Sequence, residues 1–341
     1  MPVMPAWAPP SPQRVPFTHL PSPMPPTSAS SLPVPPLPRC AGDTVGSPLA
    51  LRLSDLAMLL VAAVWGTSYG VAKGALVFYP VLGFLAVRFL LTFMVLLPAL
   101  LRTDATGRRN ALWAGLPLGV LMLGIFLCET FGLSMTSASN AAFLISLCVV
   151  FTPFAEWWLL RQRPARAMFV VAGVSLLGAA LLSGGYSGHW GWGDALMVAA
   201  AVLRAITVCQ TTQRTRNRHV PVQALTAVQA GVIGLGSLLL ALAQPGSLPP
   251  LPSLTHASAF WWACVYLVLG CTVFAFVAQN WALRHSTPTR VSVLTSSEPA
   301  FGALFAVFWL GESLSATAWA GGALIVVAAL WSMAVRTGSQ R

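Results

Sequence analysis

The stretch from Thr289 to Glu312 constrains this chain most, because an apolar segment long enough to cross a lipid bilayer carries an acid near its middle. Glu298 is that acid, and Pro299 follows it directly. Inserting a carboxylate at this depth costs roughly 2.5 kcal/mol or more. The proline removes a backbone donor, which kinks the helix and frees the carbonyl near Thr295. Lipid tolerates neither feature, so this face of the span is predicted to line a solute pathway.

The composition indicates a membrane protein. The 341 residues are 56% hydrophobic and 8% charged, and the mean hydropathy is +0.75. A soluble domain of this size presents more polar surface to water. A formal charge of +11 is also typical of proteins that bind nucleic acid. Here, however, the arginines fall in short gaps between apolar spans, which favours a lipid bilayer and no nucleic acid as the partner.

Ten apolar spans follow from Asp55 onward, each near the roughly 20 residues that a helix needs to cross a bilayer. They cover approximately residues 55–75, 80–101, 111–132, 138–160, 165–183, 193–212, 222–243, 257–281, 287–310 and 315–335. Arginines fill every second gap, while the gaps at 133–138, 184–192, 244–256 and 311–314 carry no Lys or Arg. This alternation predicts a multi-pass protein of the bacterial inner (plasma) membrane with both termini in the cytoplasm. The fold class is therefore predicted as all-α and polytopic, with ten transmembrane helices.

Both ends of the chain are predicted to lie outside the membrane. Residues 1–50 are rich in Pro, Ser and Ala and contain no sustained apolar run. Such a composition cannot bury enough surface to fold, so this segment is predicted as a disordered tail. It also lacks the basic start and the continuous apolar core of a signal peptide. Residues 337–341 are predicted as a short basic tail.

The two halves of the apolar region resemble each other. GVSLLGAALLS from Gly173 realigns with GALIVVAALWS from Gly322, 149 residues later, and the same offset pairs Arg163 with Glu312. Each half holds five spans, an odd number, so the second half must be inserted upside down. The connection between spans at this matched position therefore lies in the cytoplasm in one half, where arginine is favoured, and outside the cell in the other half, where an acid is tolerated. The predicted repeats cover residues 53–184 and 191–336.

Further matches between the halves involve charged positions. Asp55 ahead of the first span matches Asp194 ahead of the sixth, and Arg88 in the second span meets Gln229 in the seventh. Inverted repeats are typical of secondary transporters, which bind their solute at the repeat interface near the middle of the membrane. The charged positions at that depth are therefore predicted to meet the solute.

Five motifs carry a resemblance to a known family. They are AVWGTSYGVAKG (63–74), AVRF (86–89), TSASNAAFLISLCVVFTPF (136–154), GWGD (191–194) and SSEPAFGALFAVFWLGESL (296–314). Taken jointly, the region from Asp55 to Arg336 resembles the EamA type of the drug/metabolite transporter superfamily. The resemblance implies two five-helix repeats and efflux or exchange of amino acids, metabolites or drug-like molecules. Arg204 is a departure, since the matching position in the first span is Trp65; it suits an anionic substrate or a carboxylate partner.

Arg88, Arg204 and Glu298 are predicted to be the deep charges, and two interpretations of them stay open. Glu298 forms a structural ion pair with one arginine, or it serves as a proton-coupling or substrate-binding site. Other candidates for these roles, each less deep or uncharged, are Trp65, Thr295, Gln229, Lys73 and Glu129. The last two are predicted either to pair across the outer mouth or to face the lipid headgroups.

Local features of the spans lead to further expectations. Pro299 and Pro153 are predicted to kink their helices and to act as hinges. Glu156 is predicted to pair with Arg161 or to extend toward water. On the first span, Trp65-Gly66 and the spacing of Gly70 and Gly74 predict close contact with another helix. Five of the six cysteines lie inside apolar spans without metal-binding spacing, and they are predicted to be small core residues.

No enzyme motif accompanies these features. The chain has no Walker loop, HExxH, paired-aspartate cluster or GxSxG elbow, so no catalytic residue, cofactor or metal is predicted. Uphill transport then requires an ion gradient or exchange. The predicted function is secondary active transport by alternating access, as an exporter or exchanger of a small-molecule solute, with proton coupling as one driver. A polytopic membrane enzyme or a lipid flippase using the same cavity is the alternative, and the sequence leaves open whether the chain forms a homodimer.

Overall fold

The computed structural model describes residues 48–136, 138–184, 190–216, 218–246, 248–254, 257–310 and 314–335. Residues 1–47 of the predicted tail, the tail at 337–341 and the match of Arg163 with Glu312 lie outside this part. The first helix begins at Pro48 and therefore includes residues 48–50 of the predicted tail. Proline suits a first turn because its missing N–H would have no partner there.

Every secondary-structure element of the described residues is a helix, which confirms the all-α prediction. In chain order these are α1 (Pro48–Ala75), α2 (Val81–Arg102), α3 (Ala105–Met135), α4 (Ala138–Ser146), α5 (Cys148–Leu160), α6 (Arg166–Ser183), α7 (Trp192–Thr215), α8 (Val222–Ala243), α9 (Ser258–Tyr266), η1 (Leu267–Phe274), α10 (Ala275–His285), α11 (Pro288–Thr295), α12 (Glu298–Leu310) and α13 (Ala316–Ala334). Nine helical stretches in this part of the chain are long and apolar enough to cross a membrane, and one of them joins α9, η1 and α10. The ninth predicted span, 287–310, is divided between α11 and α12.

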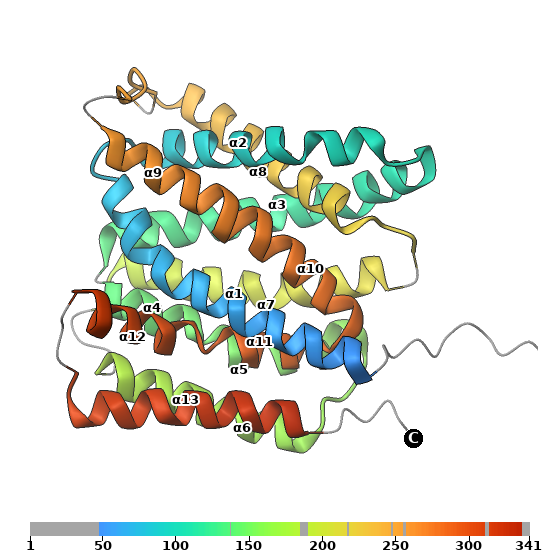
Figure 1. Cartoon of the computed structure of the whole chain (residues 1–341), viewed down its shortest axis with the longest axis vertical. Coiled ribbons are helices and arrows are strands. Elements are labelled where there is room, and N and C mark those ends of the chain that lie inside the picture. Colours follow the sequence, from blue (N-terminus) through green and yellow to red (C-terminus); the bar gives the residue numbers. More distant parts are fainter. Residues whose placement is uncertain are drawn as a thin grey trace, which may run out of the picture. The chain divides into compact units, whose positions relative to one another are not determined.

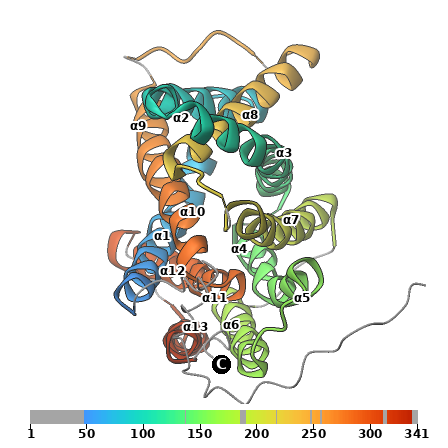
Figure 2. The same cartoon turned by 90° about the vertical axis from the view of Figure 1, so that its right-hand side faces the viewer.

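The packing of the helices repeats when the two halves are exchanged. Helix α2 lies along α8 and α6 lies along α13, so these two pairs match themselves under the exchange (Figures 1 and 2). The contact of α3 with α7 corresponds to that of α10 with α1, and the contact of α5 with α7 corresponds to those of α11 and α12 with α1. This pattern is that of a pseudo-two-fold axis between two related five-helix units, and five crossings in each unit give them opposite orientations in the membrane.

Two spans are interrupted at equivalent positions of the repeat. Helix α4 gives way to α5 at Leu147, and α11 gives way to α12 at Ser296 and Ser297. Leu147 and Ser296 are 149 residues apart, which is the offset between the halves. The second interruption directly precedes Glu298 and Pro299, as the proline predicts.

The predicted kink at Pro153 was misplaced, because Pro153 lies inside α5 and the interruption comes six residues earlier. Proline cannot donate to the carbonyl one turn before it and crowds that carbonyl, which disturbs the turn ahead of the proline. The hydroxyl of Thr152 donates to the Cys148 carbonyl at 2.7 Å and stabilises this turn. The hinge roles of Pro153 and Pro299 stay predictions.

Helices α1 and α12 cross at van der Waals distance where two glycines meet. A Cβ atom added at Gly66 would lie 2.5 Å from the Glu298 carbonyl oxygen and 2.7 Å from the Gly302 nitrogen. The close contact predicted for the first span therefore occurs at Gly66. It does not involve Gly70 or Gly74, whose added Cβ atoms would have no neighbour within 4 Å. The crossing fixes the backbone of Glu298 against α1.

We expect Gly66→Ala to lower the free energy of unfolding by about 1–3 kcal/mol, because the extra carbon forces the two backbones apart. Thermal denaturation of the purified protein in detergent measures this change. Gly74→Ala, on the same helix but in open space, is the matched control and should stay within about 0.5 kcal/mol of the parent. Equal stability of both variants would contradict the close crossing.

Candidate functional site

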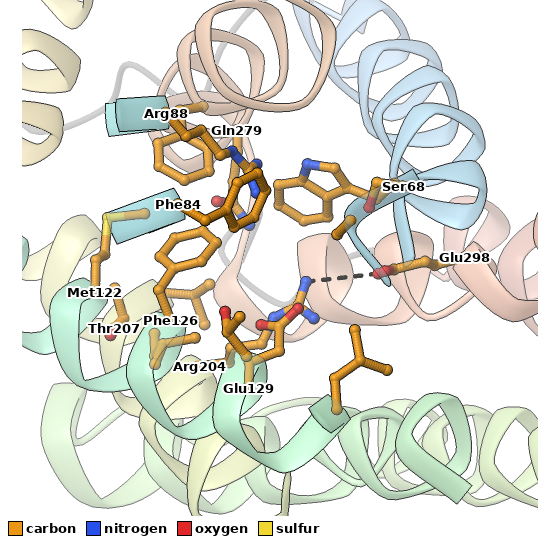
Figure 3. A pocket seen from close by; sticks show the side chains of 17 residues that line it. Ser68, Phe84, Arg88, Met122, Phe126, Glu129, Arg204, Thr207, Gln279 and Glu298 are labelled. Atoms are coloured by element: carbon orange, nitrogen blue, oxygen red, sulfur yellow. Dashed lines mark ion pairs between the residues drawn. The ribbon is translucent and has the colours of Figure 1, made fainter. Parts of the chain in front are cut away.

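A small cavity of about 90 Å³ lies where α1, α2, α3, α7, α10 and α12 face one another. Four charged side chains line it, namely Arg88, Glu129, Arg204 and Glu298, together with the aromatic side chains Trp65, Phe84, Phe126 and Phe276. Figure 3 shows Arg88 and Phe84 from one side and Glu129 and Arg204 from another, all pointing into the same space. Two cationic and two anionic groups in an aromatic enclosure give the cavity a balanced formal charge.

A larger cavity of about 580 Å³ lies on the other side of Glu298. Its walls come from α1, α4, the end of α6 and α12, and most of them are apolar. Thr295, Ser296 and Gly302 line it from the interrupted span. A cavity of this volume falls in the range of sites for drug-sized molecules.

Arg204 and Glu298 belong to the walls of both cavities. Their closest side-chain atoms, Nη2 and Oε2, lie 3.6 Å apart, and the two side chains are 17% and 8% exposed (Figure 3). This distance is longer than the 2.7–2.9 Å typical of a charge-assisted hydrogen bond. Of the two interpretations that the sequence left open, the structure therefore contains the ion pair. The pair is loose, and it partitions the space between the cavities.

Arg204 also contacts its own counterpart in the other repeat. Its guanidinium carbon lies 5.1 Å from the ring centroid of Trp65, within the range of a cation–π interaction. Trp65 and Arg204 occupy matching positions of the two repeats, and equivalent positions touch only where they lie beside the pseudo-two-fold axis. The axis therefore passes through the site, which is where a solute reaches both repeats at once.

A π-helical segment, η1, orients the other deep arginine. Wider winding lets the Thr272 hydroxyl donate to the Leu267 carbonyl five residues back, at 2.8 Å. The same hydroxyl oxygen accepts from Nε and Nη2 of Arg88, at 3.3 and 3.1 Å. The Cys271 carbonyl accepts from the indole Nε1–H of Trp65 at 2.9 Å. Insertions of this kind often occur at functional sites, but apolar periodicity does not reveal them, and the sequence interpretation missed this one.

Not all predicted candidates reach the cavities. Gln229 is buried beside them, and its side-chain oxygen accepts from Asn280 at 2.9 Å. Lys73 is exposed and, within the described residues, forms no ion pair with Glu129, so of the two predicted alternatives the structure does not contain the pair across the mouth. Thr295 lines the larger cavity, but its hydroxyl donates to the Val291 carbonyl at 2.9 Å. A back-bonded hydroxyl of this kind is already satisfied within its helix.

The arginine-rich end of the bundle is closed by a second ion pair. Arg290 at the start of α11 donates from Nε and Nη2 to both carboxylate oxygens of Asp55, at 2.9 and 2.6 Å. Both side chains are almost completely buried. The same guanidinium also donates to the carbonyls of Met333 and Val335 at the end of α13. This geometry is tight and fully hydrogen-bonded, in contrast to the loose pair between the cavities.

Glu156 stabilises the same closure. Its carboxylate accepts from the backbone N–H of Thr289 at 2.9 Å and from the Thr289 hydroxyl. The predicted pairing with Arg161 was wrong, because Glu156 is buried against the first turn of α11, where orphan N–H groups and the helix dipole favour an anion. The sequence interpretation missed the contacts of Glu156 with Thr289 and of Asp55 with Arg290 because each joins residues from different repeats.

The opposite end has a related contact that is built differently. Asp194, which matches Asp55, accepts from the Thr136 hydroxyl at 2.7 Å and from the Gly191 N–H at 2.9 Å. The contact of Asp55 with Arg290 and the contact of Asp194 with Thr136 each join the first span of one repeat to the start of the fourth span of the other. The contact at the arginine-rich end has a charged donor, and the one at the opposite end has neutral donors.

Comparison with known proteins identifies the family. The model of the EamA-like transporter family matches residues 52–184 and again residues 191–334. The chain belongs to the EamA-like transporter family. This confirms the resemblance predicted from the motifs, and it makes the protein a multi-pass membrane transporter.

Relatives agree with this membership. A protein of Archaeoglobus fulgidus described as an uncharacterized transporter is 27% identical over 279 residues, which cover 81% of this chain and 84% of the relative. A second uncharacterized transporter of the same organism is 30% identical over 200 residues, covering 57% and 65% of the two chains. One solved crystal structure matches the fold with a TM-score of 0.66 at 19% identity, over 83% of this chain and 96% of the other.

We expect Thr272→Val to destabilise this transporter by about 1–3 kcal/mol, because the Arg88 guanidinium loses its acceptor while it stays buried. Thermal denaturation in detergent checks the change. Thr272→Ser keeps the hydroxyl and should retain most of the parent stability. An equal loss in both variants would mean that the methyl group, and not the hydroxyl, matters at this position.

Proposed function

We propose that the protein is a secondary active transporter that moves a small zwitterionic solute by alternating access, as an exporter or exchanger. The observation that carries this proposal is the loose ion pair of Arg204 and Glu298, which forms a common wall of two cavities. An anionic group of the solute replaces Glu298 beside Arg204, and a cationic group replaces Arg204 beside Glu298. Binding then exchanges one ion pair for two, so the partition opens without leaving a buried charge uncompensated.

The charge balance of the smaller cavity supports a zwitterion. Arg88 and Arg204 are offset by Glu129 and Glu298, so a solute with a large net charge of either sign gains little there. The aromatic lining accommodates an apolar portion of the solute, and the larger cavity gives it further space. Amino acids and similar metabolites have this combination of groups.

Alternating access requires one end to be closed while the other is open. Both cavities lie toward the end opposite the arginine-rich gaps, since their walls include Ala72 late in α1 and Ser183 at the end of α6. The pair of Asp55 and Arg290 and an apolar cluster that includes Cys209 close the other end. With the arginine-rich end in the cytoplasm by the positive-inside rule, this conformation faces outward. Release of a solute to the cytoplasm or its uptake from there requires the closure to break.

Glu298 is also suited to bind the coupling ion, a proton. It is the acid of the pair, it lies on the path between the cavities, and protonation frees Arg204 for the anionic group of the solute. We therefore assign proton coupling to Glu298, with Pro299 and Pro153 as the hinges of the movement. If Glu298 binds the solute but no proton, the mechanism is exchange of solutes without proton coupling.

We expect Glu298→Gln and Arg204→Gln each to abolish most of the transport. A growth screen of an overexpressing strain against amino acids and toxic metabolites selects the solute, and flux into proteoliposomes with and without a proton gradient measures transport. Each substitution leaves the other charge of the pair buried without this partner, and the neutral amide of the new glutamine cannot supply the charge that binds the solute. Arg163→Gln, which changes an exposed arginine outside both cavities, is the control and should keep parental flux. Unchanged flux in Glu298→Gln would overturn the assigned site.

We expect Asp55→Asn to open the arginine-rich end more often, because Arg290 loses its charged partner. The native thiol of Cys209, buried in the apolar cluster behind this contact, reports the opening through its alkylation rate. Alkylation should rise several-fold at Cys209 and stay constant at Cys264, which is buried toward the other end. Mass spectrometry of the labelled peptides separates the two sites. A rise at both cysteines would indicate unfolding, and a rise at neither would show that the pair does not hold this end closed.

A further inference from the structure

We propose that the arginine-rich end of the protein holds a binding site for the phosphate of an anionic phospholipid, formed by Arg109, Arg214 and Arg218 around the indole of Trp113. Arg109 and Trp113 belong to α3, Arg214 to the last turn of α7, and Arg218 to the connection between α7 and α8. The site is separate from both cavities between the repeats, and its occupant is a lipid rather than the transported solute.

Two guanidinium groups stack on one indole ring in this cluster. The Cζ atom of Arg218 lies 3.9 Å from the ring centroid of Trp113, and that of Arg214 lies 5.1 Å from it. Arg109, Arg218 and Trp113 line a common groove of about 440 Å³. Stacking on an indole fixes the plane of a guanidinium while its N–H donors stay directed outward. The groove therefore presents an array of donors held by a rigid platform.

Within the described residues, the three arginines form no ion pair with a carboxylate. The two ion pairs of this part of the chain are those of Arg204 and Arg290. Asp104, at the start of α3, is engaged as a cap that accepts from the Gly107 N–H at 3.1 Å. Like charges that converge without an acid repel one another, and a bound anion removes this cost. Phosphate fits best, because its oxygens accept bidentate hydrogen bonds from guanidinium groups.

The cluster is held in place before any ligand binds. The side-chain amide of Asn110 donates to the His219 carbonyl at 3.0 Å, which ties the connection after α7 to α3. Nε of Arg214 donates to the side-chain oxygen of Gln210 at 3.3 Å. These two contacts position Arg218 and Arg214 over Trp113. A preorganised site loses less conformational entropy when it binds its ligand.

The location selects a lipid over a soluble phosphate. Trp113 is 46% exposed at the end of a membrane-spanning helix, where tryptophan rings lie at the level of the headgroups. Anionic lipids are the phosphate source in that layer, and basic residues there are attracted to them. At the same end, Arg163 lies 5.1 Å from the ring of Trp157 as a single pair. That simpler pair provides an internal comparison for the cluster.

The test compares lipid retention in full-length variants. The protein is incorporated into nanodiscs of phosphatidylcholine with a fixed fraction of phosphatidylglycerol, and native mass spectrometry counts the phosphatidylglycerol molecules that stay bound after release. An arginine that contacts the lipid phosphate contributes roughly fivefold to binding, so removing two of them in Arg214→Gln with Arg218→Gln should weaken retention by about 25-fold. Arg163→Gln removes a stacked arginine at the same end and should retain lipid as the parent does. Trp113→Leu keeps every charge and should lower retention several-fold, since the platform is lost.

Three outcomes would overturn the proposal. Equal retention of phosphatidylglycerol by the parent and the double variant would exclude the cluster as the binding site. Equal losses in Arg163→Gln and the double variant would show that retention depends only on net charge. A third arm adds inorganic phosphate to protein in phosphatidylcholine alone and measures thermal stability. Stabilisation there that disappears in the double variant, without any retained phosphatidylglycerol, would assign the site to soluble phosphates instead. Circular dichroism and size-exclusion profiles confirm that each variant is folded.

Discussion

The ion pair of Arg204 and Glu298 is the interaction on which the rest of the structure depends. A carboxylate in the middle of a membrane span is tolerated only if protein or water surrounds it and an opposite charge compensates it. The interrupted span, the glycine crossing at Gly66 and the position of α7 all bring this compensation about. Both partners belong to the second repeat, and Trp65 of the first repeat contacts Arg204 beside the pseudo-two-fold axis. A movement of one repeat against the other therefore changes the surroundings of the pair.

The two ion pairs of the described residues differ in geometry and burial, and this difference suits them to different roles. Arg290 and Asp55 are bidentate, nearly solvent-free and supported by two helix-end carbonyls. Arg204 and Glu298 are 3.6 Å apart between two cavities. A satisfied buried pair is costly to separate, whereas a loose pair beside a cavity can exchange its partners for those of a ligand. An arginine and a carboxylate thus form a tight closure at one place and a loose contact between two cavities at the other.

Part of this arrangement could be predicted from local features of the chain. Glu298 and Pro299 in an apolar run required a lined pathway, and the matching of Leu147 with Ser296 follows from the repeat offset. Pro153 gave a misplaced kink, because the disturbed turn precedes a proline and the repeat sets where the helix breaks. Lys73 and Gln229 were grouped with the site on span depth and repeat position alone. Neither criterion specifies which way a helix face points.

The sequence by itself determined the all-α membrane fold and the family, because these depend on hydropathy, periodicity and motifs along the chain. The tertiary structure alone decided the partners: Arg204 for Glu298, Asp55 for Arg290, Thr289 for Glu156 and Thr272 for Arg88. It also placed the π-helical segment and the wall between the cavities. Each of these joins residues from different spans, and the rotation of each helix about its own axis, set by packing against its neighbours, determines which side chains meet.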